Sequence, residues 1–237
     1  VLLASTCLEY SLKPNAARIL SLGRFMHKKD SKLLEEVATY YSEKLAEHGD
    51  TPRGVDWNGE ESQMVRFAQL CKIINPKTSK FSLNDLGCGY GALLDYLLEE
   101  YTTCTYLGVD VSHEMIKAAV QRYATDDHTH FITSAELDQP ADYGVASGIF
   151  NVRLERTDAE WFDYLLDTLD MLDRTSSLGF AFNCLTSYSD ENKKHDYLYY
   201  ADPCQLFDLC KRRYSLQVAL LHDYGLYEFT ILVRKKP

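Results

Sequence analysis

The segment Asp85-Leu86-Gly87-Cys88-Gly89-Tyr90-Gly91 decides the fold that this sequence predicts. The residues that lead into it, 81–86, are typical of a buried strand, and residues 91–100 carry leucines at helical spacing. Glycine at every second position lets the backbone turn sharply and lets a ligand approach without a Cβ in the way. The segment therefore predicts a strand, a glycine turn and a helix whose first backbone N–H groups are free.

The same alternation of strands and helices extends outward along the chain. We expect further strands at 104–110, 129–133, 143–149 and 177–185, and helices at 31–49, 60–74, 112–124, 157–172 and 203–213. Two last strands, 216–222 and 226–233, flank a short turn and predict a hairpin. This order favours an α/β fold with a mostly parallel sheet covered on both faces, to which the hairpin adds an antiparallel strand.

Composition narrows the class of protein. The 237 residues are 46% hydrophobic and 25% charged, with a net charge of −10, and an acidic surface makes duplex nucleic acid an unexpected partner. The seven cysteines form no Cys-x-x-Cys pair, which favours free thiols in the cytoplasm over a disulfide framework. No run approaches the roughly 20 apolar residues of a membrane span. No cluster of histidine and cysteine predicts a metal site.

Asp110 ends the next strand, 19 residues after Gly91, and indicates the kind of ligand. A carboxylate there can accept hydrogen bonds from both ribose hydroxyls, so we expect an adenosine-type ligand. Gly87-x-Gly89-x-x-Ala92 also matches the looser dinucleotide fingerprint, which leaves an NAD-dependent oxidoreductase as an alternative. Asp85 precedes the first glycine, where an acid suits a cationic sulfonium better than a pyrophosphate.

At this point the sequence resembles the class I S-adenosylmethionine-dependent methyltransferases. Residues 85–91 match the family's acidic-x-G-x-G-x-G motif, and Asp110 matches its acid at the end of the second strand. The run Gly108-Val-Asp-Val-Ser-His-Glu-Met-Ile-Lys-Ala-Ala119 is similar to the family's usual GVDxSxxMIxxA passage. The resemblance covers roughly residues 35–235. It implies a Rossmann-like, seven-stranded, mostly parallel sheet with a C-terminal antiparallel hairpin and an N-terminal helical cap.

Three regions follow along the chain. Residues 1–30 are expected to be an N-terminal appendage, which includes a short apolar start that is a poor signal peptide. Residues 31–76 would form the helical cap over the cofactor site, and residues 77–237 the methyltransferase core.

The resemblance also implies where S-adenosylmethionine binds. Asp85 and the backbone of Gly87 and Gly89 would hold the methionine moiety, with Gly91 completing the turn. Asp110 would hold the ribose hydroxyls.

The adenine contacts come from the next two strand ends. Val111 or Met115 would pack on the ring. The family commonly places an acid after the third strand, but here that stretch is Ser134-Ala135-Glu136, so either Ser134 or Glu136 could meet the adenine amino group.

Residues on two further segments are expected near the methyl group. Ser147, Phe150 and Asn151 follow the fourth strand, which in the family faces that group. In the cap, Trp57 is a candidate cofactor contact, and Arg66 could hold the cofactor carboxylate in a bidentate pair or form a surface salt bridge.

The irregular, tyrosine-rich stretch 186–202 is the expected lid over the acceptor. Tyr188, Tyr197 and Tyr199 offer broad contact with polar tips. His195 in this stretch and His222 at a strand end are candidate general bases, since histidine titrates near neutrality.

These features together predict a methyltransferase that acts on an O or N atom of a small molecule. Its main work would be to align the nucleophile with the methyl group and to exclude water. A non-catalytic cofactor-binding regulator is the other alternative. The sequence leaves the acceptor's identity, the use of a base and the oligomeric state open.

Overall fold

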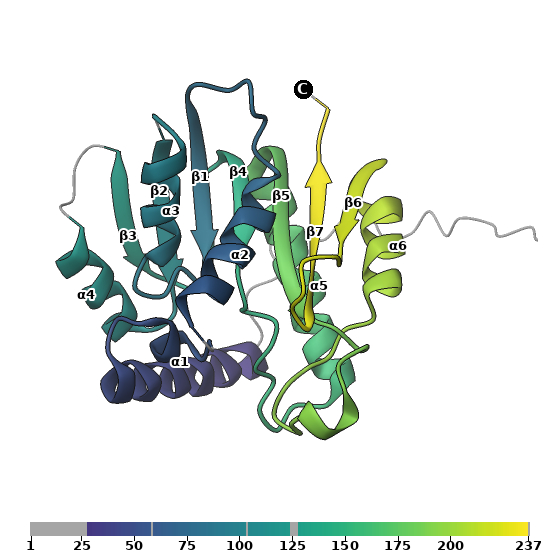
Figure 1. The fold of residues 1–237 in the computed structure, drawn as a ribbon. Coiled ribbons are helices and arrows are strands. Elements are labelled where there is room, and N and C mark those ends of the chain that lie inside the picture. Colours follow the sequence, from purple (N-terminus) through teal and green to yellow (C-terminus); the bar gives the residue numbers. More distant parts are fainter. Residues whose placement is uncertain (1–27, 58, 103, 124–127, 237) are drawn as a thin grey trace, which may run out of the picture.

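A seven-stranded sheet lies at the centre of the described part of the chain, in a computed structural model that describes residues 28–57, 59–102, 104–123 and 128–236 (Figure 1). The strand order is β3-β2-β1-β4-β5-β7-β6. The strands are β1 Phe81–Leu86, β2 Cys104–Asp110, β3 Thr129–Thr133, β4 Ala141–Ala146, β5 Ser176–Leu185, β6 Gln217–Leu221 and β7 Glu228–Arg234. The first five run parallel, and β7 runs antiparallel to both of its neighbours, as the predicted fold class requires.

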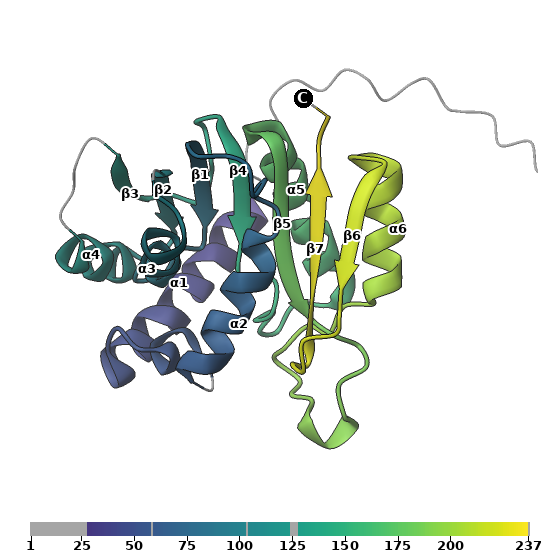
Figure 2. The ribbon, with the colours of Figure 1, turned by 45° about the horizontal axis from the view of Figure 1, so that its top comes forward.

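Helices cover both faces of this sheet (Figures 1 and 2). These helices are α2 Glu60–Cys71, α3 Ala92–Glu100, α4 His113–Arg122, α5 Asp158–Thr175 and α6 Pro203–Arg213. The described chain also contains α1 Lys28–His48 and short 3-10 turns at η1 Pro52–Val55 and η2 Glu191–Lys193. Phe67 of α2 and Leu97 of α3 lie in the core on one face, whereas Leu165 of α5 and Leu206 of α6 lie in the core on the other. The carboxyl ends of the parallel strands stay free of this covering, which is where open α/β sheets bind ligands.

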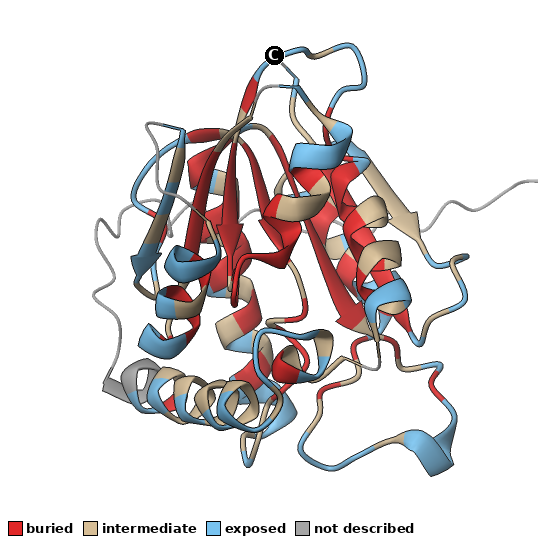
Figure 3. Ribbon diagram, turned by 60° about the vertical axis from the view of Figure 1, so that its left-hand side comes forward, coloured by how far each residue is buried: buried red, intermediate tan, exposed pale blue. Residues whose placement is uncertain are grey.

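Helix α1 runs across those carboxyl ends (Figures 1 and 3). Leu33 near its start is buried in the core of the α5–α6 face, and Tyr41 and Leu45 further along pack against the core of the α2–α3 face. Ser42 hydrogen-bonds to Ser112, the residue that caps α4. The helix therefore closes one end of the sheet rather than covering a face.

Most predicted boundaries agree with the structure. Strands 81–86, 104–110 and 129–133 have the predicted bounds, and Thr157 begins α5 with the expected capping box. The strand predicted at 143–149 is present, but its bounds are wrong: β4 starts earlier, at Ala141, and ends at Ala146, because Gly148 adopts a φ of +76° that a strand cannot hold. Helix α2 ends at Cys71 rather than 74, and α5 continues past 172 to Thr175.

The three predicted regions are only partly within the described residues. Of the proposed appendage, residues 1–27 lie outside them, and α1 already begins at Lys28. No helix of the described chain is long and apolar enough to cross a membrane. The described residues also contain no group of three His, Cys, Asp or Glu side chains placed to hold a metal ion.

Candidate active site

The glycine turn after β1 has the backbone geometry that only glycine adopts easily. Gly87, Gly89 and Gly91 have φ angles of +74°, +54° and +84°. A Cβ at Gly87 would lie 2.1 Å from Cγ2 of Ile149, so that position also lacks room for a side chain. Gly91 is the N-cap of α3, which begins at Ala92. The turn therefore presents bare backbone at the carboxyl end of the central strand.

Asp85, at the end of β1, is buried to 2% exposure directly before this turn. The hydroxyl of Tyr106 donates a hydrogen bond of 2.7 Å to its Oδ2, whereas its Oδ1 is buried without a hydrogen-bond partner among the described residues. Burial raises the pKa of Asp85 to about 7, and the nearby charge of Asp110 adds to this rise. The site thus contains an acid whose second oxygen is unsatisfied.

Asp110 ties the end of β2 to the glycine turn. Its Oδ2 accepts the backbone N–H of Gly89 at 2.9 Å, and its Oδ1 accepts that of Ser112 at 2.8 Å. Burial raises its pKa, although these backbone hydrogen bonds work in the other direction. A carboxylate has about four lone-pair sites, so both oxygens can still accept a hydroxyl.

A cavity that is partly open to solvent lies over these two acids, with a volume of about 100 Å³ for the centres of water-sized molecules. Most of the predicted cofactor residues line it: Trp57, Asp85, Gly87, Gly89, Asp110, Val111, Met115, Ser134, Ala135 and Ser147. Five separate segments of the sequence therefore meet at one place.

Comparison with known proteins fits this geometry. Residues 84–171 match the family model described as "Methyltransferase domain". The protein named "Putative methyltransferase Rv1506c" of Mycobacterium tuberculosis (strain ATCC 25618 / H37Rv) is 62% identical over 164 residues, which is 69% of this chain and 98% of that protein.

The chain belongs to the class I S-adenosylmethionine-dependent methyltransferases. It is therefore an enzyme of this family, and the NAD-dependent oxidoreductase and the non-catalytic regulator are excluded as alternatives. Solved structures share the fold at low sequence identity. DhpI in complex with SAM and HEP has a TM-score of 0.60 at 12% identity, covering 86% of this chain and 98% of its own. The N-methyltransferase NodS from Bradyrhizobium japonicum WM9 has a TM-score of 0.59 at 14% identity, covering 84% and 98%.

The residues of the cavity fit S-adenosylmethionine. That molecule carries a cationic sulfonium, an α-ammonium group and two ribose hydroxyls, and the cavity offers the buried Asp85, the half-buried Asp110 and a bare glycine turn. Two lining residues, Asp85 and Ser147, each have a buried oxygen without a hydrogen-bond partner among the described residues. Buried polar atoms are rarely left unsatisfied, so these two point to a polar ligand.

Residues of two helices that the sequence analysis did not name as site residues also line the cavity: α1, which belongs to the predicted cap, and α5. Leu34, Val37 and Tyr41 come from α1, and Tyr164 and Met171 come from α5. Burial raises the pKa of Tyr164 to about 12. The residues of α1 recur at the spacing of any buried helix face, so the sequence carries no signal that separates them from core residues.

Arg66 makes neither of its two expected contacts, the cofactor carboxylate or a surface salt bridge. It does not line the described cavity, and its guanidinium donates from Nε and Nη2 to the two carboxylate oxygens of Glu228, both at 2.8 Å. Both side chains are buried, and the guanidinium lies 4.8 Å from the centre of the Trp57 ring. Because Glu228 already occupies the donors that would hold a cofactor carboxylate, Arg66 is not proposed as a cofactor contact.

Four other predicted residues lie outside the described lining. Glu136 is exposed, and its backbone N–H bonds to the hydroxyl of Ser134, so Ser134 is the one of the pair that lines the cavity. Phe150 is fully buried and packs on Phe182, and Asn151 accepts the N–H of Leu185. Gly91 caps α3 instead of lining the cavity.

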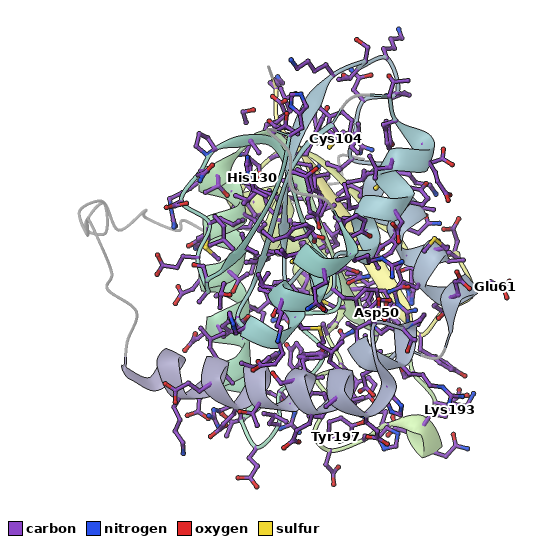
Figure 4. All side chains as sticks on the ribbon, turned by 90° about the vertical axis from the view of Figure 1, so that its left-hand side faces the viewer. Asp50, Glu61, Cys104, His130, Lys193 and Tyr197 are labelled. Atoms are coloured by element: carbon purple, nitrogen blue, oxygen red, sulfur yellow. The ribbon has the colours of Figure 1, made fainter. Side chains whose placement is uncertain are left out.

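The segment 186–202 lies at the same end of the sheet as α1, outside the cavity lining. Figure 4 shows Lys193 and Tyr197 at this end, while Cys104 and His130 lie at the opposite end of the strands. The candidate bases are both exposed: His195 lies 5.6 Å from the ring of Tyr197, and His222 lies 6.0 Å from that of Tyr188, between ring centres. Tyr199 is buried.

Proposed function

We propose that this methyltransferase transfers the methyl group of S-adenosylmethionine to a nitrogen or oxygen atom of a small molecule. The observation that carries the proposal is the cavity over Asp85 and Asp110, which α1 and α5 wall with Val37, Tyr41 and Tyr164. Such walls suit a compact acceptor and exclude water from the reacting atoms. The net charge of −10 argues against duplex nucleic acid as the acceptor.

The residues that line the cavity around the cofactor have separate tasks in this proposal. Asp85 binds the α-ammonium group, and the bare backbone at Gly87 and Gly89 lets the methionine moiety approach. Asp110 accepts the ribose hydroxyls while it fixes the turn through Gly89. Val111, Met115, Ser134 and Ala135 surround the adenine, and Trp57 and Ser147 bound the side toward the acceptor.

The bound cofactor supplies an activated methyl group, so the protein's remaining work is alignment and desolvation. Among the described lining residues there is no histidine or lysine. An amine nitrogen attacks with its own lone pair, whereas a weakly acidic hydroxyl needs a base. This favours a nitrogen acceptor, and among the fold neighbours NodS is named as an N-methyltransferase. An oxygen acceptor would require His195 or His222 to reach it.

A further part of the proposal concerns where the enzyme works. The six described cysteines are free thiols, which supports a cytoplasmic location, where thiols stay reduced.

A fold neighbour also bears on the class of acceptor. ChlM from Synechocystis PCC 6803 is named as a magnesium protoporphyrin IX methyltransferase. The substrate in its name, magnesium protoporphyrin IX, is also a small molecule, which agrees with the proposed acceptor class.

The donor half of the proposal is tested by calorimetry with S-adenosylhomocysteine. Asp110→Ala removes the acceptor of the ribose hydroxyls, and because each hydrogen bond to a charged group contributes roughly 1.5–3 kcal/mol, affinity should fall about 100-fold. Asp138→Ala, at an exposed aspartate outside the lining, is the matched control and should bind normally. Absence of binding by the unaltered chain would contradict the proposal.

The acceptor half is tested with methyl-labelled S-adenosylmethionine and a fractionated metabolite extract. Label should enter a small molecule, and mass spectrometry of the product should place it on nitrogen. Label on oxygen would mean that the acceptor needs a general base, for which His195 and His222 are the candidates. Label confined to protein or nucleic acid would exclude a small-molecule acceptor.

A further inference from the structure

One face of β2 carries three residues that together surround Asp85. Side chains alternate along a strand, so Tyr106, Gly108 and Asp110 lie on the same face. The register pairs Asp85 with Gly108 and Leu83 with Tyr106. A Cβ at Gly108 would lie 2.7 Å from Cδ1 of Phe131 and 2.9 Å from Sγ of Cys88, so these two side chains fill the space at this position and Gly108 itself offers no group to Asp85. Tyr106, one step back on the same face, is then the neighbour that reaches the carboxylate.

The contact between Tyr106 and Asp85 is short and fully enclosed. The hydroxyl lies 2.7 Å from Oδ2, in the range of strong hydrogen bonds to a carboxylate. Tyr106 has no exposed surface, and its ring packs edge-on against Phe131 at 5.7 Å between centres. A donor held this firmly fixes the carboxylate's rotation, and it thereby decides that Oδ1 is the oxygen left without a partner.

The described titratable groups around Asp85 are acids and include no cation. Asp110 and Tyr106 on β2, Cys88 in the glycine turn and Cys71 on α2 are the described titratable groups that interact with it. None of these groups is positively charged in either protonation state. A buried carboxylate without a cation is costly, so an incoming positive charge has a strong effect at this position.

We propose that Tyr106 is a positioning residue for the cofactor. Its hydroxyl holds Oδ2 of Asp85 so that Oδ1 meets the α-ammonium group, and this contact expels the proton that Asp85 carries in the empty site. The inference rests on the proposed binding role of Asp85 and goes beyond it, because it assigns a task to Tyr106 and a proton to the binding step. The O–H bond of the carboxyl group breaks, and the proton passes to solvent as the carboxylate pairs with the ammonium.

The direction of the proton transfer follows from the pKa of Asp85. Burial raises it to about 7, so near neutral pH part of the Asp85 carboxyl population is protonated before binding. The hydrogen bond from Tyr106 favours the ionised form, and a bound cation favours it further. Removing the hydroxyl therefore raises the pKa of the empty site and increases the number of protons released on binding.

The test compares two probes by calorimetry at pH 7. S-adenosylhomocysteine has the α-ammonium group, and 5′-methylthioadenosine shares the adenosine part but lacks that group. Tyr106→Phe should weaken S-adenosylhomocysteine about tenfold, as expected for a lost hydrogen bond to a charged group, and should leave methylthioadenosine within about twofold. A loss that is equal for both probes would mean that Tyr106 only supports the fold, and the proposal would be overturned.

Proton release gives a second measurement that needs no variant. Binding enthalpies in two buffers of different ionisation enthalpy should show protons released with S-adenosylhomocysteine and essentially none with methylthioadenosine. Tyr106→Phe should increase that release. Equal release with both probes would overturn the proposal even if the variant did not fold.

Asp85→Asn separates this inference from the proposed function. If it leaves S-adenosylhomocysteine affinity unchanged, then Asp85 does not bind the ammonium and the assigned role of Asp85 fails. If Asp85→Asn weakens binding at least tenfold while Tyr106→Phe has no effect, only the role of Tyr106 fails.

Discussion

The β1–β2 side and the β7 side of the sheet both contain buried acids, but only one side supplies a cation. Glu228 at the start of β7 receives two hydrogen bonds from the guanidinium of Arg66. Asp85 and Asp110 receive a hydroxyl and backbone N–H groups and have no described cationic partner. The difference separates structure from function: the paired acid is complete without a ligand, whereas the unpaired acids are completed by one.

The largest effect is expected on the paired side. Arg66→Met leaves Glu228 buried without its cation, which should cost about 3–5 kcal/mol of unfolding free energy. Affinity for S-adenosylhomocysteine should change less than about threefold, because Arg66 does not line the described cavity. Denaturant unfolding and calorimetry measure the two quantities, with the exposed Arg174→Met as control. Unchanged stability with a large loss of affinity would restore the cofactor role that the sequence suggested.

Removing the charge of Asp85 should raise the unfolding free energy, which is the opposite of the effect expected at Arg66. The pKa of Asp85 is about 7 in the folded chain and 3.8 as the ordinary value, so the native state binds more protons between these limits. Stability without ligand should therefore fall as pH rises from about 4 to 7. Asp85→Asn removes the charge whose burial causes this fall, and it should raise the unfolding free energy at pH 8 by up to about 4 kcal/mol.

Unfolding curves at pH 4.5 and pH 8 check this expectation, since the difference between variant and parent should be small at the lower pH and large at the higher. A difference that is the same at both would show that Asp85 does not titrate in this range. Asp138→Asn is the exposed control.

The glycine turn beside Asp85 and Asp110 should tolerate an added side chain less well than an open turn does. Gly87→Ala and Gly225→Ala impose the same left-handed strain, at φ of +74° and +76°, but only the first meets Ile149. Gly225→Ala should cost about 1–2 kcal/mol and Gly87→Ala about 1–3 kcal/mol more. Thermal unfolding resolves this gap at roughly 2–4 °C per kcal/mol. Equal losses would mean that Ile149 moves aside freely.

The smallest effect on cofactor binding is expected from the exposed histidines. His195→Ala should leave S-adenosylhomocysteine affinity within about twofold, because no favourable contact with a buried ligand is lost at an exposed site. His130→Ala, at the opposite end of the strands (Figure 4), is the control. Any change confined to His195→Ala should occur in acceptor turnover. A tenfold loss of S-adenosylhomocysteine affinity would place the 186–202 segment against the cofactor.

The predictable part of the site is the part encoded by local backbone requirements. The glycines after β1, the acid that ends β2 and the Ser112 cap each follow from a requirement within a few residues. The pairing of Arg66 with Glu228 spans 162 positions, and nothing near either residue announces it. The cap was predicted as a region, but the residues of α1 that line the cavity were not, since Val37 looks like any residue on a buried helix face. Tertiary packing, rather than local pattern, decides these contacts.

Trp57, which lines the cavity, gives the enzyme an intrinsic fluorescence signal. The sequence contains two tryptophans, and the other, Trp161, is fully buried and donates its indole N–H to the carbonyl of Phe150, away from the described cavity. Indole emission is sensitive to the polarity and contacts of the ring. Trp57, held between Arg66 and the turn at Gly148, should change its fluorescence when the cavity fills, while Trp161 should stay constant. A label-free titration could therefore screen acceptors on the unaltered chain.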